Sequence, residues 1–132
     1  MYGSGQARVS WIALGDVAQF AVEAVDNPAG RDASIDLGGP SALSYADVIA
    51  RAERLRGRPL EVRVVPEAAL EAQRAAAPDD LAQSFAALQL AVARGGVIDM
   101  RETLRRFPIR LTPVEAHLER LLGSRAAAGA SV

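Results

Sequence analysis

The sequence contains no cysteine and no lysine, and each absence excludes a class of chemistry. Without cysteine there is no disulfide, no thiolate metal ligand and no thiol nucleophile. Without lysine there is no Schiff base and no catalytic lysine, because all 15 cationic residues are arginines. The single histidine, His117, has no residues close in sequence that would complete a metal cluster or a Ser-His-Asp triad. We therefore predict no catalytic residue and no metal site in this chain.

Strong charge and long hydrophobic runs are also missing. The formal net charge is -1, so the chain lacks the basic excess that is typical of nucleic-acid-binding proteins. No stretch approaches the roughly 20 apolar residues of a membrane span, and residues 1–10 lack the apolar core of a signal peptide. We expect a cytoplasmic protein with neither nucleic acid nor membrane among its partners.

The composition is that of one globular domain. The 132 residues are 50% hydrophobic and 23% charged, and single domains cluster at about 100–150 residues. Much of the apolar content is alanine and only 5% of residues are aromatic, so the core should be small. We expect one folded unit over residues 1–123, followed by a flexible Ala/Gly/Ser tail at 124–132.

Alternation of apolar and polar residues predicts three short strands, at residues 7–13, 33–37 and 61–65. The second and third strands flank a predicted helix and form a strand-helix-strand unit. If these two strands are parallel in one sheet, the crossover between them should be right-handed. Several additional helices surround this unit, so the predicted fold class is α/β.

The helix signals are clearest after Ser44, which is placed as an N-cap with Asp47 as the acid of a capping box, while Gly57 and Pro59 end the helix. Further helices are predicted from Asp16, as N-cap, to the residue before Asn27, from Pro66 to Ala77, from Asp79 to Arg94, from Met100 to Arg105, and from Thr112, as N-cap, to Gly123.

The segment from residue 79 to 94 is apolar around most of its circumference. Between Leu81 and Ala93 the only polar residues are Gln83, Ser84 and Gln89. Such a helix is buried on more than one side, or it faces a ligand pocket or a partner surface.

Three stretches carry a family resemblance: Val9-Ser10-Trp11-Ile12 followed by Asp16-Val17-Ala18, then the block LGGPSALSYADV from Leu37 to Val48, then Gly57-Arg58-Pro59-Leu60. In this order they resemble the C-terminal part of NmrA-like proteins, which belong to the short-chain dehydrogenase/reductase superfamily. The middle block is the most specific of the three. The likeness covers about residues 5–100.

The resemblance implies a partial Rossmann-type lobe that lacks the nucleotide-binding half. In that family a Rossmann domain with a glycine-rich turn precedes this region, whereas Gly3-Ser4-Gly5 lacks the third glycine and the strand-turn-helix context. The superfamily's Tyr-x-x-x-Lys pair is also absent, because Ile49 stands at the fourth position after Tyr45. The implied function is the substrate-binding lobe of an NAD(P)-dependent oxidoreductase-like protein. By itself this lobe would bind no cofactor and would not be active, and NAD(P) is implied only for the full-length family.

In that family this lobe closes over the substrate beside the nicotinamide. With the apolar surface of residues 79–94, this pattern points to a substrate pocket lined by Trp11, Phe85, Leu88, Gln89 and Met100. Core packing is the commoner role for each of them. Two alternatives remain open, a dimerising interaction module and a small-molecule binder that has lost the chemistry. The expected partner is accordingly a second copy, the missing Rossmann half or a small-molecule ligand.

Other polar and aromatic residues have ordinary structural explanations. Asp16 is more typical of an N-cap than of a catalytic acid, and Tyr45 begins the apolar face of its helix, where aromatic rings usually join the core. His117 lies beside an apolar stripe and is expected at a boundary with a partly buried ring. The arginines at 51, 54 and 58 form a charged helix face that is more often solvated than anion-binding.

Overall fold

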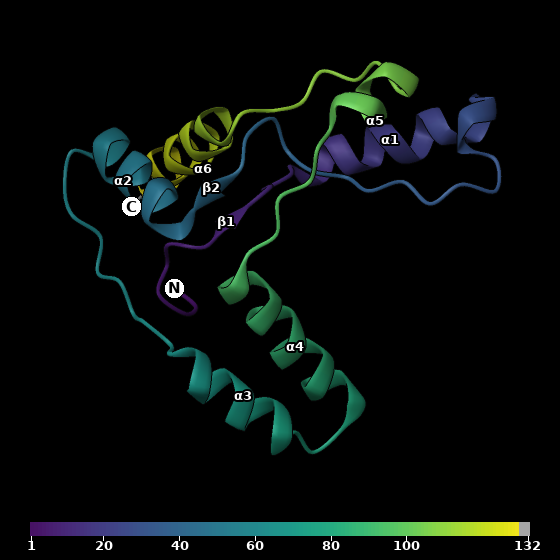
Figure 1. Cartoon of the computed structure of the whole chain (residues 1–132). Coiled ribbons are helices and arrows are strands. Elements are labelled where there is room, and N and C mark those ends of the chain that lie inside the picture. The colour runs from purple at the N-terminus through teal and green to yellow at the C-terminus, as the bar shows by residue number, and fades with distance from the viewer. Residues whose placement is uncertain (130–132) are drawn as a thin grey trace.

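The computed structural model describes residues 1–129 as six α-helices, a 3-10 turn and a short two-stranded ribbon. The elements are β1 (Arg8–Val9), α1 (Leu14–Asp26), the 3-10 turn η1 (Pro28–Gly30), β2 (Leu43–Ser44), α2 (Tyr45–Arg56), α3 (Glu67–Ala75), α4 (Asp80–Arg94), α5 (Arg101–Arg106) and α6 (Val114–Gly129). The ribbon lies at the centre, α2 and α6 lie side by side, and α3 and α4 form a hairpin that protrudes from the body (Figure 1).

The sheet differs most from the sequence prediction. β1 and β2 pair antiparallel, with Arg8 opposite Ser44 and Val9 opposite Leu43. Residues 33–37 and 61–65 form no strand, apart from a single bridge between Val65 and Tyr2. The predicted strand-helix-strand unit and its parallel crossover are therefore wrong. Alternation makes a segment suitable for an extended conformation, but a strand also needs a neighbour that supplies its hydrogen bonds.

The helices agree better with the sequence because their signals are local. Ser44 caps α2 in a capping box with Asp47, and Gly57 ends that helix in the left-handed conformation. Asp79 caps α4 through its side chain. α6 continues past Gly123 to Gly129, so the predicted end of this helix at Gly123 is wrong. Residues 124–129 of the predicted tail therefore belong to α6, and its last residues, 130–132, lie outside the described residues.

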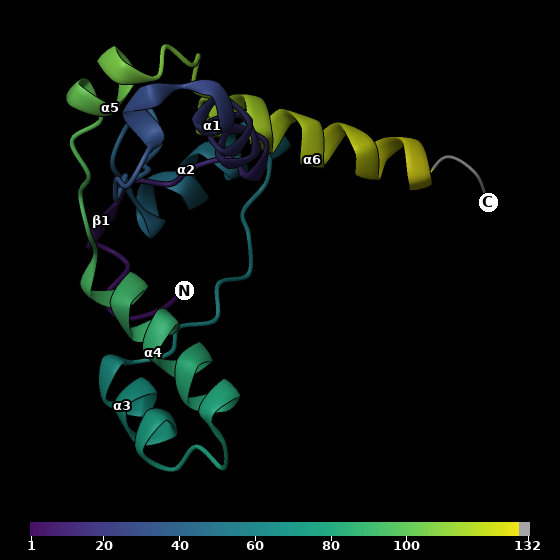
Figure 2. The ribbon, with the colours of Figure 1, turned by 90° about the vertical axis from the view of Figure 1, so that its right-hand side faces the viewer.

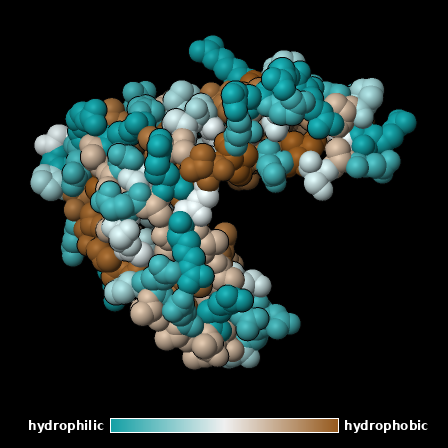
Figure 3. All heavy atoms as spheres, viewed as in Figure 1, coloured by the Kyte–Doolittle hydropathy of each residue, from teal (hydrophilic) through white to brown (hydrophobic). Residues whose placement is uncertain are grey.

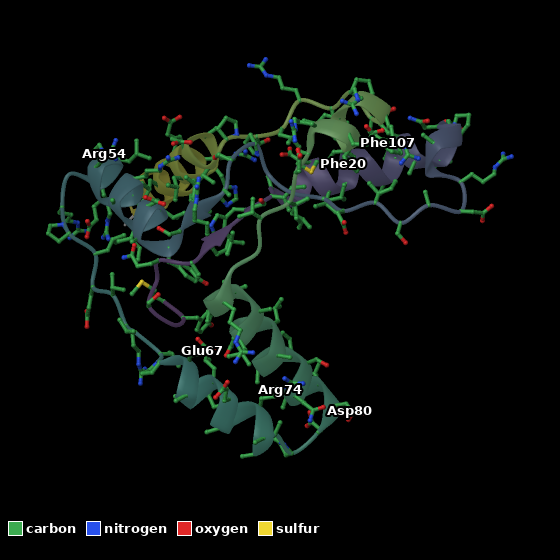
Figure 4. All side chains as sticks on the ribbon, viewed as in Figure 1. Phe20, Arg54, Glu67, Arg74, Asp80 and Phe107 are labelled. Atoms are coloured by element: carbon green, nitrogen blue, oxygen red, sulfur yellow. The ribbon has the colours of Figure 1, made fainter. Side chains whose placement is uncertain are left out.

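Two small hydrophobic clusters stabilise the described residues. In the first, Phe20 of α1 and Phe107 after α5 meet edge to face, with ring centroids 6.2 Å apart, and Met100 packs against them (Figure 4). In the second, Leu70 of α3 packs against Leu90 and Ala93 of α4. The first cluster joins α1 to α5, and the second holds the α3–α4 hairpin together.

Figure 2, turned by 90° from the view of Figure 1, shows that α6 extends away from the body on one side and the α3–α4 hairpin on another. The hairpin joins the body where Tyr2 and Val65 pack against its cluster. Within the described part of the chain, no helix combines the length and the hydrophobicity that crossing a bilayer requires.

Candidate functional site: an aromatic pocket between β1, α2 and α6

An apolar pocket with polar groups on its wall lies between the end of β1, α2 and the start of α6. Its volume is about 390 Å³, within the range of small-molecule sites. Its wall is predominantly apolar and is formed by Trp11, Ile12, Ala13, Leu14, Tyr45, Val48, Thr112, Val114, His117 and Leu118. Three segments that are far apart in the sequence therefore form one concave surface.

An aromatic row makes up one wall. The Trp11 and Tyr45 rings meet edge to face with centroids 5.0 Å apart, and Tyr2 continues the row at 6.1 Å from Tyr45. The indole Nε1 of Trp11 donates a hydrogen bond of 2.8 Å to the carbonyl oxygen of Leu43. This bond satisfies the polar edge of the indole, so the ring presents an apolar surface to the pocket.

Burial raises the pKa of the Tyr45 phenol above its ordinary value of 10.0, and the neighbouring Tyr2 adds to this effect. The phenol is therefore uncharged at neutral pH and retains its O–H group as a donor. Tyr45 was expected in the core, but it is half-buried and lines the pocket. It supplies a hydrogen-bond donor beside the Trp11 ring.

Asp16 holds the pocket together from behind. Its carboxylate is 2% exposed and accepts hydrogen bonds from the backbone N–H and the hydroxyl of Thr112, each 2.7 Å long. Helix α1 begins at Leu14, with Ala13 as its N-cap, so the predicted N-cap role of Asp16 is wrong. The Thr112 hydroxyl, which was predicted to cap the last helix, donates its hydrogen bond to Asp16. The two residues fasten the segment before α6 to the start of α1.

Charged groups connect the two helices that contribute walls to the pocket. Arg51 of α2 forms an ion pair with Glu115 of α6, which links two walls of the pocket. His117 lines the same pocket and is an exposed residue, so its ring is accessible from solvent. Arg54 lies at the outer end of α2 (Figure 4). An apolar molecule with a hydrogen-bonding group at one end fits this combination of an aromatic wall with the Tyr45 and His117 side chains.

The five residues predicted for a substrate pocket do not line one cavity. Trp11 lies in the aromatic pocket. Met100 is buried, and its Sδ accepts a hydrogen bond of 3.0 Å from the backbone N–H of Gly38. Phe85 and Gln89 border a shallow groove beside the turn of the α3–α4 hairpin, and the Leu88 side chain is 60% exposed on α4. Contact of these five residues with a substrate stays a prediction.

Helix α4 is not buried on more than one side. Ala86, Leu90 and Ala93 face α3, whereas Leu81 and Phe85 are 67% and 57% exposed. The other alternative for this helix, an apolar face toward a ligand or a partner, remains.

Sequence reasoning did not find the wall that α6 contributes. Val114, His117 and Leu118 lie about 100 residues after Trp11, and no local pattern relates the two segments. The only signal was the apolar stripe of the last helix, which predicts a buried face without its neighbour.

Comparisons with known proteins give a consistent picture, although no family model matches the chain. The chain is 35% identical over 83 residues to an NAD(P)H azoreductase from Xenophilus azovorans, a match that covers 61% of this chain and 29% of that protein. Its fold resembles that of an NADPH-dependent quinone oxidoreductase from Escherichia coli, with a TM-score of 0.70 at 20% identity. It also resembles an isoflavone reductase, with a TM-score of 0.68 at 19% identity.

The two solved structures match over 92% of this chain, but the chain spans only 46% of the quinone oxidoreductase and 42% of the isoflavone reductase. It therefore accounts for less than half the length of each of the proteins that it resembles. In sequence and in fold, this chain is similar to NAD(P)-dependent reductases, which supports at this coarser level the resemblance that the three sequence stretches carry.

Proposed function

We propose that this chain is the substrate-side lobe of an NAD(P)-dependent reductase-like protein and that its aromatic pocket receives the apolar part of the substrate. The carrying observation is the similarity to an NAD(P)H azoreductase over a stretch that makes up only 29% of that protein. The chain itself has neither a glycine-rich phosphate loop nor a Tyr-x-x-x-Lys pair. The nucleotide would accordingly be held by residues outside this chain.

The geometry of the pocket supports the substrate role. A reductase that transfers hydride needs a dry, apolar site in which the acceptor is held against the nicotinamide. The edge-to-face pair of Trp11 and Tyr45 provides an apolar aromatic wall, and the neutral Tyr45 phenol can donate a hydrogen bond to an oxygen or nitrogen of the acceptor. The chain's own residues would bind and orient the acceptor, while the reducing equivalent comes from NAD(P)H held elsewhere.

Three measurements test the proposal. The purified 132-residue chain, titrated with NADPH and followed by the fluorescence of the reduced nicotinamide, should show no saturable binding in the micromolar range. Joined to the part of the azoreductase relative that lies outside the match, it should oxidise NADPH in the presence of an aromatic acceptor. Val48→Trp, which fills the pocket, should raise KM in that chimera. Micromolar NADPH affinity of the isolated chain would contradict the proposal.

A second candidate function rests on the pocket alone. A small-molecule binder that has lost the chemistry would use the same aromatic wall without any nucleotide. In this case Val48→Trp should weaken binding of an aromatic ligand to the isolated chain. The chimera should show no turnover of NADPH. The two candidates therefore differ in the effect of the added nucleotide-binding part.

A further inference from the structure

Helix α4 carries an apolar stripe that the pocket does not use. Its members are Leu81, Phe85, Leu88 and Val92, and we call them the α4 stripe. The first three side chains are 67%, 57% and 60% exposed, and Val92 is half-buried. They lie on the side of α4 opposite Leu90 and Ala93, which pack in the hairpin cluster with Leu70 of α3.

The spacing of the α4 stripe is that of a helix-pairing seam. Its members follow one another after four, three and four residues, which is the a/d pattern by which two helices pack side by side. No charged residue lies between Leu81 and Ala93. A continuous seam without charge favours a second helix of the same kind over a small polar ligand.

We propose that the α4 stripe pairs with the α4 stripe of a second copy of this chain, in antiparallel orientation. Each copy contributes a hairpin, and because the stripe faces away from α3, the two α4 helices would lie at the centre with one α3 helix on each outer side. The hairpin protrudes from the body in both views (Figures 1 and 2), which leaves room for a second copy to approach. Figure 3 shows weakly and strongly hydrophobic atoms on the hairpin between the hydrophilic ones.

The order of charges along α4 selects the antiparallel orientation. Asp79 and Asp80 are at the beginning of the helix, and Arg94 is at its end. A two-fold axis at the middle of the stripe places Leu81 opposite Val92 of the other copy and keeps the two acidic beginnings at opposite ends of the pair, while each Arg94 stays paired with Glu67 and Glu71 of its own α3. A parallel pair would bring like charges together, and it would also align rather than oppose the two helix dipoles.

The size of the surface fixes the expected strength. Three large side chains that are more than half exposed, with their small neighbours, would bury on the order of 1,000 Å² in total, at the low end of specific interfaces. We therefore expect a weak dimer that forms with rising concentration. The net charge of -1 opposes this association little.

Sedimentation velocity on the full chain over a range of concentrations tests the pairing. The weight-average mass should rise from 13.9 kDa toward twice this value. Leu88→Glu places a charge in the seam and should weaken the dimer at least tenfold. The matched control is Val22→Glu on α1, which changes an apolar side chain of similar exposure, 71%, to the same acid and should leave the association unchanged.

The orientation has its own test, because a chain without cysteine allows unambiguous disulfide trapping. A mixture of Leu81→Cys and Val92→Cys chains should give the mixed disulfide on mild oxidation. Leu81→Cys alone should not, because two such positions would lie about 16 Å apart along the helix axis, at 1.5 Å per residue.

Three results would overturn the inference: a mass that stays at 13.9 kDa up to about 1 mM, an equal effect of the two glutamate variants, or efficient self-linking of Leu81→Cys. If the chain is monomeric and Leu88→Glu instead impairs the chimera, the stripe is covered by the nucleotide-binding part or faces the substrate. The mass and the turnover are separate readouts, so the pairing and the proposed function can fail independently.

Discussion

At the scale of single residues, Gly39 is the glycine that leaves the least space for a side chain. A Cβ atom there would lie 1.6 Å from the carbonyl oxygen of Trp11, which is backbone and cannot move aside as a side chain can. The segment before β2 therefore runs directly against the strand end that forms the pocket floor. This close approach of two backbones is what requires glycine at position 39.

Gly39→Ala should therefore destabilise the protein, by at least about 2 kcal/mol, because the backbone of one segment has to shift. Gly15→Ala is the matched control. A Cβ at Gly15 meets nothing within 4 Å, and this residue lies in α1, where alanine stabilises a helix by up to about 1 kcal/mol relative to glycine. Urea denaturation of the two variants measures both effects. Equal stabilities would show that the Gly39–Trp11 approach is not needed.

At the scale of secondary-structure elements, α2 is the best-defined helix. The Ser44 hydroxyl accepts a hydrogen bond from the backbone N–H of Asp47, and the Asp47 carboxylate accepts one from the backbone N–H of Ser44. This second bond is the largest cause that lowers the pKa of Asp47 below its ordinary 3.8, and the bond from the Ser44 hydroxyl adds to it. The capping box fixes where α2 begins, and with it where Tyr45 enters the pocket.

Ser44→Ala should cost about 1 kcal/mol of unfolding free energy at neutral pH, as expected for the loss of an N-cap. The pH dependence follows from the lowered pKa of Asp47. A carboxyl that is more acidic when folded stabilises the protein above its unfolded pKa, near 3.8, and this stabilisation is lost as the pH falls through the folded value. The difference between the wild type and Asp47→Asn should therefore be constant above about pH 5 and shrink in acid. Chemical denaturation at several pH values measures it, and a difference that grows in acid would contradict this account.

The α3–α4 hairpin shows the limit of local signals at this scale. The predicted ranges of these helices, Pro66 to Ala77 and Asp79 to Arg94, lie close to their observed bounds. Glu67 and Glu71 of α3 pair with Arg94 of α4, each at 2.5 Å, and so fix how the two helices meet. That meeting buries one side of α4 and leaves its stripe outside, which the nearly uniform apolar sequence could not decide.

At the scale of the whole molecule, the bond between Asp16 and Thr112 joins residues 96 positions apart. It fastens the start of α1 to the segment that leads into α6, and so brings two walls of the aromatic pocket together. A buried carboxylate needs such donors, because an ionised group without partners is costly to bury.

Asp16→Ala leaves the Thr112 N–H and hydroxyl without their acceptor, so we expect a loss of roughly 3 kcal/mol in unfolding free energy. Thr112→Val retains the shape of the side chain and the backbone bond, and it should lose only about 1 kcal/mol. Thermal and urea unfolding measure these losses. If Asp16→Ala does not fold, Thr112→Val still tests the link, and a Thr112→Val protein as stable as the wild type would contradict it.

The whole molecule also explains why the predicted substrate residues separated. Trp11 and Met100 follow β1 and α4 respectively, whereas Phe85, Leu88 and Gln89 lie in the protruding hairpin. Sequence order and a family pattern brought these five residues into one list. In the described residues, the body and the hairpin present them to different surfaces.

The sequence by itself determined where most of the helices lie and the caps of α2 and α4, because a cap, a break or an amphipathic stripe depends on residues within one or two turns. Only the tertiary structure decided the strand pairing, the role of Asp16 and the pocket between β1, α2 and α6. These features depend on contacts between residues up to about 100 positions apart, and such contacts leave no periodic trace in either segment. Free energy gained across that distance comes from complementary shapes and satisfied donors, which exist only once both segments are in place.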